Sequence, residues 1–144
     1  MPGSVPSPTG LFGAVDMSAS AMSAERLRMT VASENLAHAG DTRKGADGLP
    51  YARQRVLFRT VLDGQGRDTG KVDASAVKSP RFEKRYDPDH PDADAAGMVT
   101  TPAIDPILEL TDLMLAGKAY EANANAARGL MRMHENALRL SADS

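Results

Sequence analysis

Apolar and small residues recur in a heptad pattern, three and four residues apart in turn, along the C-terminal part of the chain between residues 105 and 138. The series consists of Leu110, Leu113, Gly117, Tyr120, Ala124, Ala127, Met131 and Leu138, with His134 as its one interruption. Spacing sustained in this way predicts a coiled-coil seam rather than the broad apolar face of a globular-domain helix. Such a helix would be about 50 Å long at ~1.5 Å per residue. We therefore expect another helix or another molecule to cover the stripe.

A second helical pattern lies near the N-terminus, over residues 11–39. Its seven-residue series is Val15, Met22, Met29 and Leu36. Asp16 is the expected N-cap, and Gly40 is the expected C-terminal cap ahead of a turn-rich stretch. The two helices share one period, so they are expected to pair with each other.

The period changes to two after Tyr51, which indicates strands. Residues 63–66 predict a turn, alternation returns over residues 77–86, and a brief extended segment precedes residue 101. Asp105 and Pro106 then form a favourable N-cap and first-position pair for the C-terminal helix. The predicted fold class is α+β, with two long terminal helices forming a coiled-coil hairpin around a small, irregular β-rich insert. The expected divisions are a disordered tail (1–10), an N-terminal helix (11–40), the insert (41–101) and a C-terminal helix (102–144).

Composition supports thin helical seams over a thick core. Aromatic residues make up 4% of the chain, there is no Trp, and there are eight Met. The formal charge of -2, from 17 basic and 19 acidic residues, argues against a sequence-independent nucleic-acid binder. Without cysteine, disulfides and thiol chemistry are excluded. The sequence also shows neither a long apolar run nor the pattern of a cleaved signal peptide, so membrane insertion is not expected.

The strongest candidate for chemistry is an acidic loop. It contains Asp87, Asp89, His90, Asp92 and Asp94. An EF-hand loop counted from Asp87 would need Gly at position six and Glu at position twelve, where this chain has Asp92 and Met98. Turn formation by Asp and Pro is therefore favoured over a metal site. No catalytic, cofactor-binding or metal-binding residues and no small-molecule substrate are expected, because the chain has no nucleophile elbow, phosphate loop or paired histidine ligands.

Three stretches resemble the flagellar basal-body rod proteins of the axial family, most closely those of the proximal rod. Residues 31–39 (VASENLAHA) resemble the family motif A-S-N-[IL]-A-N-A, and residues 119–123 (AYEAN) resemble [RK]-[AS]-Y-[EQ]-A-N. The middle loop is the most specific stretch. Its motif residues are Tyr86, Asp87, Pro88, His90, Pro91, Asp92, Asp94 and Gly97. Glu34 and His38 depart from the first motif, and Met98 stands where an aromatic residue is usual.

The resemblance implies a structural subunit that polymerises through its terminal helices into the hollow proximal rod of the flagellar basal body, in the periplasm. Its implied partners are itself, other rod proteins and the flagellar type III export apparatus, which exports such proteins without cleavage. It also places Asn35 and Asn123, from the two helical motifs, among the helix and subunit contacts. We further expect residues 11–40 and 104–140 to be largely disordered before assembly, since isolated helices are marginal in water.

The competing interpretation is a cytoplasmic helical-hairpin adaptor or export chaperone that dimerises through the same helices. It explains the heptads but not the resemblance of the middle loop. A discrete, stable dimer in solution would favour it.

Overall fold

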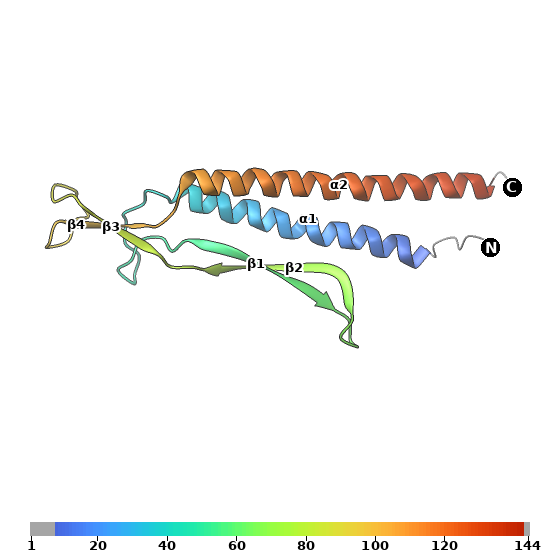
Figure 1. Cartoon of the computed structure of the whole chain (residues 1–144), viewed down its shortest axis with the longest axis horizontal. Coiled ribbons are helices and arrows are strands. Elements are labelled where there is room, and N and C mark those ends of the chain that lie inside the picture. Colours follow the sequence, from blue (N-terminus) through green and yellow to red (C-terminus); the bar gives the residue numbers. More distant parts are fainter. Residues whose placement is uncertain (1–7, 143–144) are drawn as a thin grey trace. The chain divides into compact units, whose positions relative to one another are not determined.

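The computed structural model describes residues 8–142 of the 144-residue chain. In chain order its elements are α1 (Pro8–Ala37), β1 (Gln54–Leu62), β2 (Asp68–Lys78), β3 (Phe82–Tyr86), β4 (Met98–Pro102) and α2 (Pro106–Ala142) (Figure 1). Two long terminal helices thus flank a small β-rich region. The predicted α+β class is confirmed.

The chain divides into two compact units. Among the described residues, we call 27–57 and 75–116 the central unit, and 8–26, 58–74 and 117–142 the terminal unit. Each unit contains a piece of α1, a piece of α2 and part of the β1–β2 sheet. The sequence suggested that the helices and the insert are separate parts. The two compact units instead each combine helix segments with part of the insert.

The start of α1 differs from the prediction. The helix begins at Pro8, so residues 8–10 of the expected tail are helical, while residues 1–7 lie outside the described part of the chain. Asp16 is an interior helical residue and not an N-cap. Its Oδ2 lies 3.2 Å from Nζ of Lys71, an ion pair within the terminal unit.

The end of α1 also differs from the prediction. The last helical residue is Ala37, and Gly40 does not adopt the positive φ that a left-handed C-terminal cap requires. A turn closes instead, in which the N–H of Asp41 donates to the carbonyl of His38 (3.1 Å). The helix is thus followed by an ordinary turn and not by a glycine cap.

The start of α2 is as predicted. Pro106 is the first helical residue, and Oδ1 of Asp105 accepts hydrogen bonds from the N–H groups of Ile107 (2.9 Å) and Leu108 (3.4 Å). These donors have no partner inside the helix, so the Asp105 side chain satisfies them.

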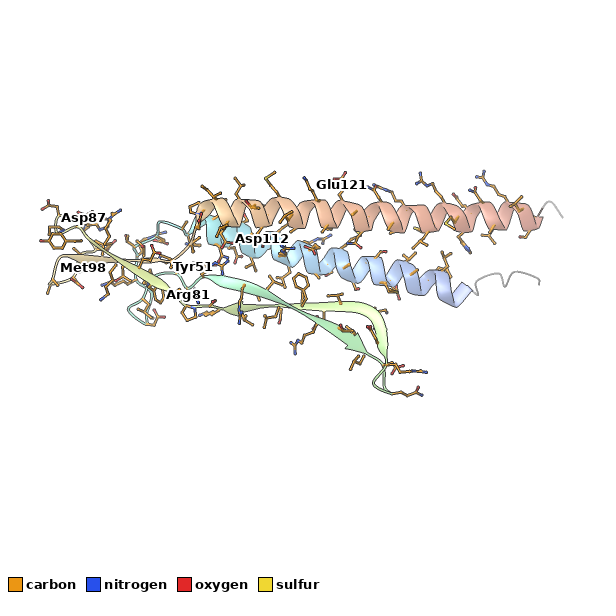
Figure 2. The ribbon with its side chains drawn as sticks, in the orientation of Figure 1. Tyr51, Arg81, Asp87, Met98, Asp112 and Glu121 are labelled. Atoms are coloured by element: carbon orange, nitrogen blue, oxygen red, sulfur yellow. The ribbon has the colours of Figure 1, made fainter. Side chains whose placement is uncertain are left out.

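The strands form two separate two-stranded sheets, β1–β2 and β3–β4. The first turns at residues 63–67, where Asp63 accepts three hydrogen bonds and Gly66 has φ +78°. The second is antiparallel, with Phe82 opposite Pro102 and Tyr86 opposite Met98. Figure 2 shows Asp87 and Met98 at the end of this β3–β4 hairpin. Each described strand therefore has a single strand neighbour, which leaves the other edge of every strand without one.

The buried residues are small and few. Hydrophobic side chains with less than a tenth of their surface exposed are Ala24, Val31, Ala32, Val99 and Ala116, and the buried polar side chains are Asn35 and Glu109. Apart from Ala24, all of these belong to the central unit. The composition correctly indicated a thin interior, because alanine allows close helix approach without adding bulk.

Candidate assembly interface

The central unit contains a buried polar network around Asn35, which is 1% exposed. Its Nδ2 donates to the carbonyl of Gln54 (2.8 Å) and to Oε2 of Glu109 (3.1 Å). Its Oδ1 accepts from the N–H of Gln54 (2.9 Å) and from the hydroxyl of Tyr51 (3.1 Å). All four hydrogen-bonding positions of the amide are therefore used within the chain.

Glu109 is the second member of this network and is 3% exposed. Its Oε1 accepts a hydrogen bond from Nε of Arg53 at 2.7 Å, and Nη2 of the same guanidinium lies equally close. Because Arg53 and Asn35 occupy both carboxylate oxygens, the buried charge is paired and hydrogen-bonded. Burial of an unpaired carboxylate would be strongly unfavourable.

The α1 and α2 segments also contact each other through charged and aromatic groups in each unit. In the central unit Arg28 donates to both carboxylate oxygens of Asp112, with 3.0 and 3.1 Å from Nε. Figure 2 shows Asp112 on the side of α2 that faces α1. In the terminal unit the Arg26 guanidinium lies 5.9 Å from the ring centroid of Tyr120 and donates to its hydroxyl (3.3 Å). The helix segments are antiparallel within each unit.

The predicted seam residues fall into two groups. Eleven are half-buried: Val15, Met22, Met29, Leu36, Leu113, Gly117, Tyr120, Asn123, Ala124, Ala127 and His134. Three are exposed: Leu110, Met131 and Leu138. Together with buried Asn35, these residues remain our candidates for helix and subunit contacts. Leu110 and Leu138 are available to another molecule, whereas Met131 also lines the groove between the helix segments of the terminal unit.

In the first turns of α2, the most buried positions lie one residue before the predicted seam positions. The most buried positions are Glu109 and Ala116, followed at seven-residue spacing by half-buried Asn123 and Leu130. Glu109 and Ala116 are thus more buried than the predicted Leu110 and Gly117, whereas Asn123 and the predicted Ala124 are both half-buried. Heptad counting selected the apolar residues, whereas packing against α1 selected small residues and one paired carboxylate.

A further apolar stripe on the first turns of α2 was missed. Ile107, Leu108, Met114 and Leu115 are all more than half exposed. Their spacing of one, seven and eight residues places them on one helix face. A search for a second apolar stripe on the same helix would have found them. Within residues 8–142, no helix is apolar enough over a sufficient length to cross a bilayer.

The terminal unit has an apolar groove of about 470 Å³ between its helix segments. It is lined by Leu11, Phe12, Val15, Arg128, Met131, Arg132, His134 and Glu135. The rings of Phe12 and His134 meet edge to face with centroids 6.0 Å apart. His134, which interrupts the predicted series, thus contacts α1 in the same chain.

In the acidic loop, side chains accept hydrogen bonds from the N–H groups of the loop's own backbone. Oδ1 of Asp94 accepts from the N–H groups of Ala96 and Met98, both at 2.9 Å, and these hydrogen bonds hold the pKa of that carboxyl below its usual value. Asp92 accepts from the hydroxyl of Thr42 (2.6 Å), and its own N–H donates to Nδ1 of His90 (3.1 Å). Within residues 8–142, no group of three or more His, Asp or Glu side chains is placed to hold a metal ion.

Gly97 makes the same loop compact. Its φ is +72°, and a Cβ there would lie 3.0 Å from Cβ of Pro88 and from Cε2 of Tyr86. Tyr86 is 69% exposed although it belongs to the loop motif. The loop therefore has a rigid frame that presents an aromatic ring to solvent.

These features define a class of protein. Helix segments that leave many large apolar side chains exposed are typical of a protein that binds other protein molecules through those helices.

Comparison with known proteins identifies the family. No protein-family model matches the chain. It is 37% identical to the flagellar basal-body rod protein FlgC of Bacillus subtilis over 139 residues, covering 83% of this chain and 93% of that one. It is 40% identical to FlgC of Salmonella typhimurium over 115 residues (78% and 84%) and 36% identical to FlgC of Aquifex aeolicus over 117 residues (81% and 86%). The chain belongs to the FlgC family of flagellar basal-body rod proteins.

Proposed function

We infer that this chain is a structural subunit of the flagellar basal-body rod, where it associates with other rod components. Likeness to the FlgC proteins along most of the chain is the observation that carries this conclusion. The cytoplasmic adaptor is not favoured, because it accounts for the helices alone.

We propose further that the subunit polymerises with itself and with neighbouring rod proteins through its two helices, as part of a hollow proximal rod in the periplasm. Large apolar side chains that the single chain leaves uncovered support this. On α2 they are Ile107, Leu108, Leu110, Met114, Leu115, Met131, Met133, Leu138 and Leu140. Because burial of each such side chain is worth about 1.5–3 kcal/mol, a contact that covers several of them supplies the stability of an assembly.

Export through the flagellar type III apparatus, without a cleaved signal, is part of the same proposal. This part of the proposal is supported by the small number of buried side chains in the terminal unit. Of its described residues only Ala24 is among the buried hydrophobic side chains, so little packing opposes unfolding of its helix segments before export.

Deletion of the gene in the source bacterium, with complementation, tests the proposed function. The deletion strain should lack flagella, and the wild-type gene should restore them. Normal filaments without this protein would reject the rod subunit.

Matched variants of one helix test the assembly surface. Leu138→Glu places a charge on an exposed apolar position, whereas Asn136→Glu places the same charge on an exposed polar position two residues away. We expect L138E to abolish or strongly reduce complementation and N136E to preserve it, with equal thermal stability of both purified monomers. If both variants complemented equally well, the face of α2 that carries Leu138 would not be part of the assembly contact.

A further inference from the structure

The Asn35 side chain binds the main chain of Gln54 in the way that a neighbouring strand would. Nδ2 donates to the Gln54 carbonyl (2.8 Å) while Oδ1 accepts from the Gln54 N–H (2.9 Å), so one residue exchanges both of its main-chain hydrogen bonds with a single amide. A narrowly spaced pair of this kind is the unit of an antiparallel ladder. Gln54 is the first residue of β1, so the amide supplies a strand partner where the sheet begins.

The same amide connects three segments. Asn35 lies on α1 and Glu109 lies on the first turns of α2. Gln54 is the first residue of β1, and Arg53 immediately precedes it. Asn35 donates to Glu109, Glu109 accepts from Arg53, and Arg53 precedes Gln54 in the chain. The contacts therefore form a closed ring, and all of them lie within the central unit.

Removal of any segment from this ring leaves a buried group without a partner. If β1 detaches, the Asn35 amide loses three of its four hydrogen bonds, including the one from Tyr51, and Glu109 loses its guanidinium. If α2 detaches, one Asn35 donor and the Arg53 cation lose their acceptor. Buried groups left unsatisfied in this way carry the full cost of desolvation.

We propose that the Asn35 amide is a surrogate peptide group that couples two events, the docking of β1 on the helices and the pairing of α1 with α2. The two events are then one cooperative step, and the central unit has no stable state with the helices paired and the insert released. This conclusion concerns the folding of the subunit and holds whatever the subunit assembles with.

A double-mutant cycle on residues 35 and 109 tests the coupling. In the wild type, residue 35 donates the hydrogen bond to residue 109, and in the double variant residue 109 donates it to residue 35. Asn35→Asp places a carboxylate against Glu109 and removes the donor to the Gln54 carbonyl, so we expect the unfolding equilibrium constant to rise about 100-fold. Glu109→Gln must turn its Nε2 toward a second donor, either Nδ2 of Asn35 or the guanidinium of Arg53, and therefore also destabilises. In the double variant, Nε2 of the glutamine donates to the aspartate, and at least a tenfold recovery relative to N35D is expected.

The decisive result is whether Glu109→Gln raises or lowers the unfolding free energy in each background. E109Q should destabilise the wild-type protein and stabilise N35D, measured by urea unfolding at pH 7. If the two substitutions are additive, or if the double variant is less stable than N35D, the proposed coupling is wrong.

A second measurement covers the case in which N35D does not fold. Tyr51→Phe removes only the hydroxyl donor to Asn35, and Arg53→Met removes only the guanidinium. Hydrogen exchange should accelerate in both variants at the Gln54 N–H and also in residues 109–116 of α2. The control Asn136→Ala, which removes an amide from an exposed position of α2 in the terminal unit, should leave both regions unchanged. If exchange accelerated only at Gln54, Asn35 would stabilise the start of β1 without coupling it to α2, and the proposal would be wrong.

Discussion

The central and terminal units each contain part of α1, part of α2 and part of the β1–β2 sheet, but they stabilise these parts differently. The central unit contains four of the five buried hydrophobic side chains, three on its helix segments and Val99 on β4, together with the Asn35–Glu109 network. In the terminal unit the described contacts are mainly at the surface, such as Arg26 with Tyr120, Asp16 with Lys71, and Phe12 with His134. The comparison shows that one continuous helix can be firmly held at one end and weakly held at the other, because stability follows local burial and not helix length.

The largest expected effect is a difference in hydrogen exchange along each helix of the monomer. Amides near Val31 and Asn35 in α1 and near Ala116 in α2 should exchange about 100-fold more slowly than those near Val15 and Met131, because the latter open locally. Mass spectrometry of peptides from both regions provides the measurement. Equal protection along the whole of α1 and α2 would contradict the comparison. If that protection were strong, it would also contradict helices that order only on assembly.

That prediction sharpens our expectation that residues 11–40 and 104–140 are disordered before assembly. The structure gives a physical reason to divide each of these segments. Residues 27–37 and 106–116 belong to the unit with the buried network, whereas residues 8–26 and 117–142 do not. We now expect disorder to concentrate in the second set.

Overpacking should give the next largest effect. Ala116 has no exposed surface, so Ala116→Leu forces apart the groups around it and should cost about 1–3 kcal/mol of unfolding free energy. Ala126→Leu, on an exposed position of the same helix in the terminal unit, should change stability by less than about 0.5 kcal/mol. Denaturant unfolding of the two variants checks the difference. Equal losses would mean that the two units are packed alike.

Two glycine substitutions should act in opposite directions. Gly97→Ala introduces a Cβ at φ +72° against Pro88 and Tyr86, so a loss of about 1–2 kcal/mol is expected. Gly129→Ala lies inside α2 with nothing within 4 Å of the new Cβ, and a gain of up to about 1 kcal/mol is expected from helix propensity. Thermal unfolding of both variants is the measurement. A neutral G97A would show that the loop frame is not rigid.

Acidification should have the smallest effect. Hydrogen bonds from Arg43 and His38 lower the pKa of Asp41, hydrogen bonds from Arg67 and Gln65 lower that of Asp63, and hydrogen bonds from Met98 and Ala96 lower that of Asp94. Because the folded values lie below the unfolded value of about 3.9, these carboxylates stabilise the protein fully above roughly pH 5. Their contribution is lost as pH falls through 4 toward the folded values.

Asparagine variants distinguish the two units in this titration. D41N and D94N should each flatten the pH dependence of unfolding between pH 5 and 3 in the central unit, and D63N should do so in the terminal unit. Unfolding monitored by separate probes on each unit provides the measurement. A slope unchanged by all three substitutions would assign acid sensitivity to other groups.

Sequence reasoning was most successful where local chemistry decides the structure. Asp105 and Pro106 define the start of α2, and the turn at residues 63–67 follows from its glycines and Asp63. It was least successful where distant segments decide the structure. No local pattern places Glu109 in the interior, because its burial depends on Arg53 and Asn35, which are 56 and 74 residues away in the chain. The family resemblance singled out Asn35, but only the structure shows what its amide binds.

The open edges of the β1–β2 sheet have a practical consequence for work with the purified protein. Each strand has one neighbour, and Leu57, Phe58, Val61 and Leu62 are exposed along β1. An exposed strand edge with apolar side chains is a template for sheet growth between molecules. Concentrated stocks should therefore form β-rich aggregates unrelated to the helical assembly, and an assay that reports only particle size would confuse the two products. Circular dichroism of the assembled material separates them.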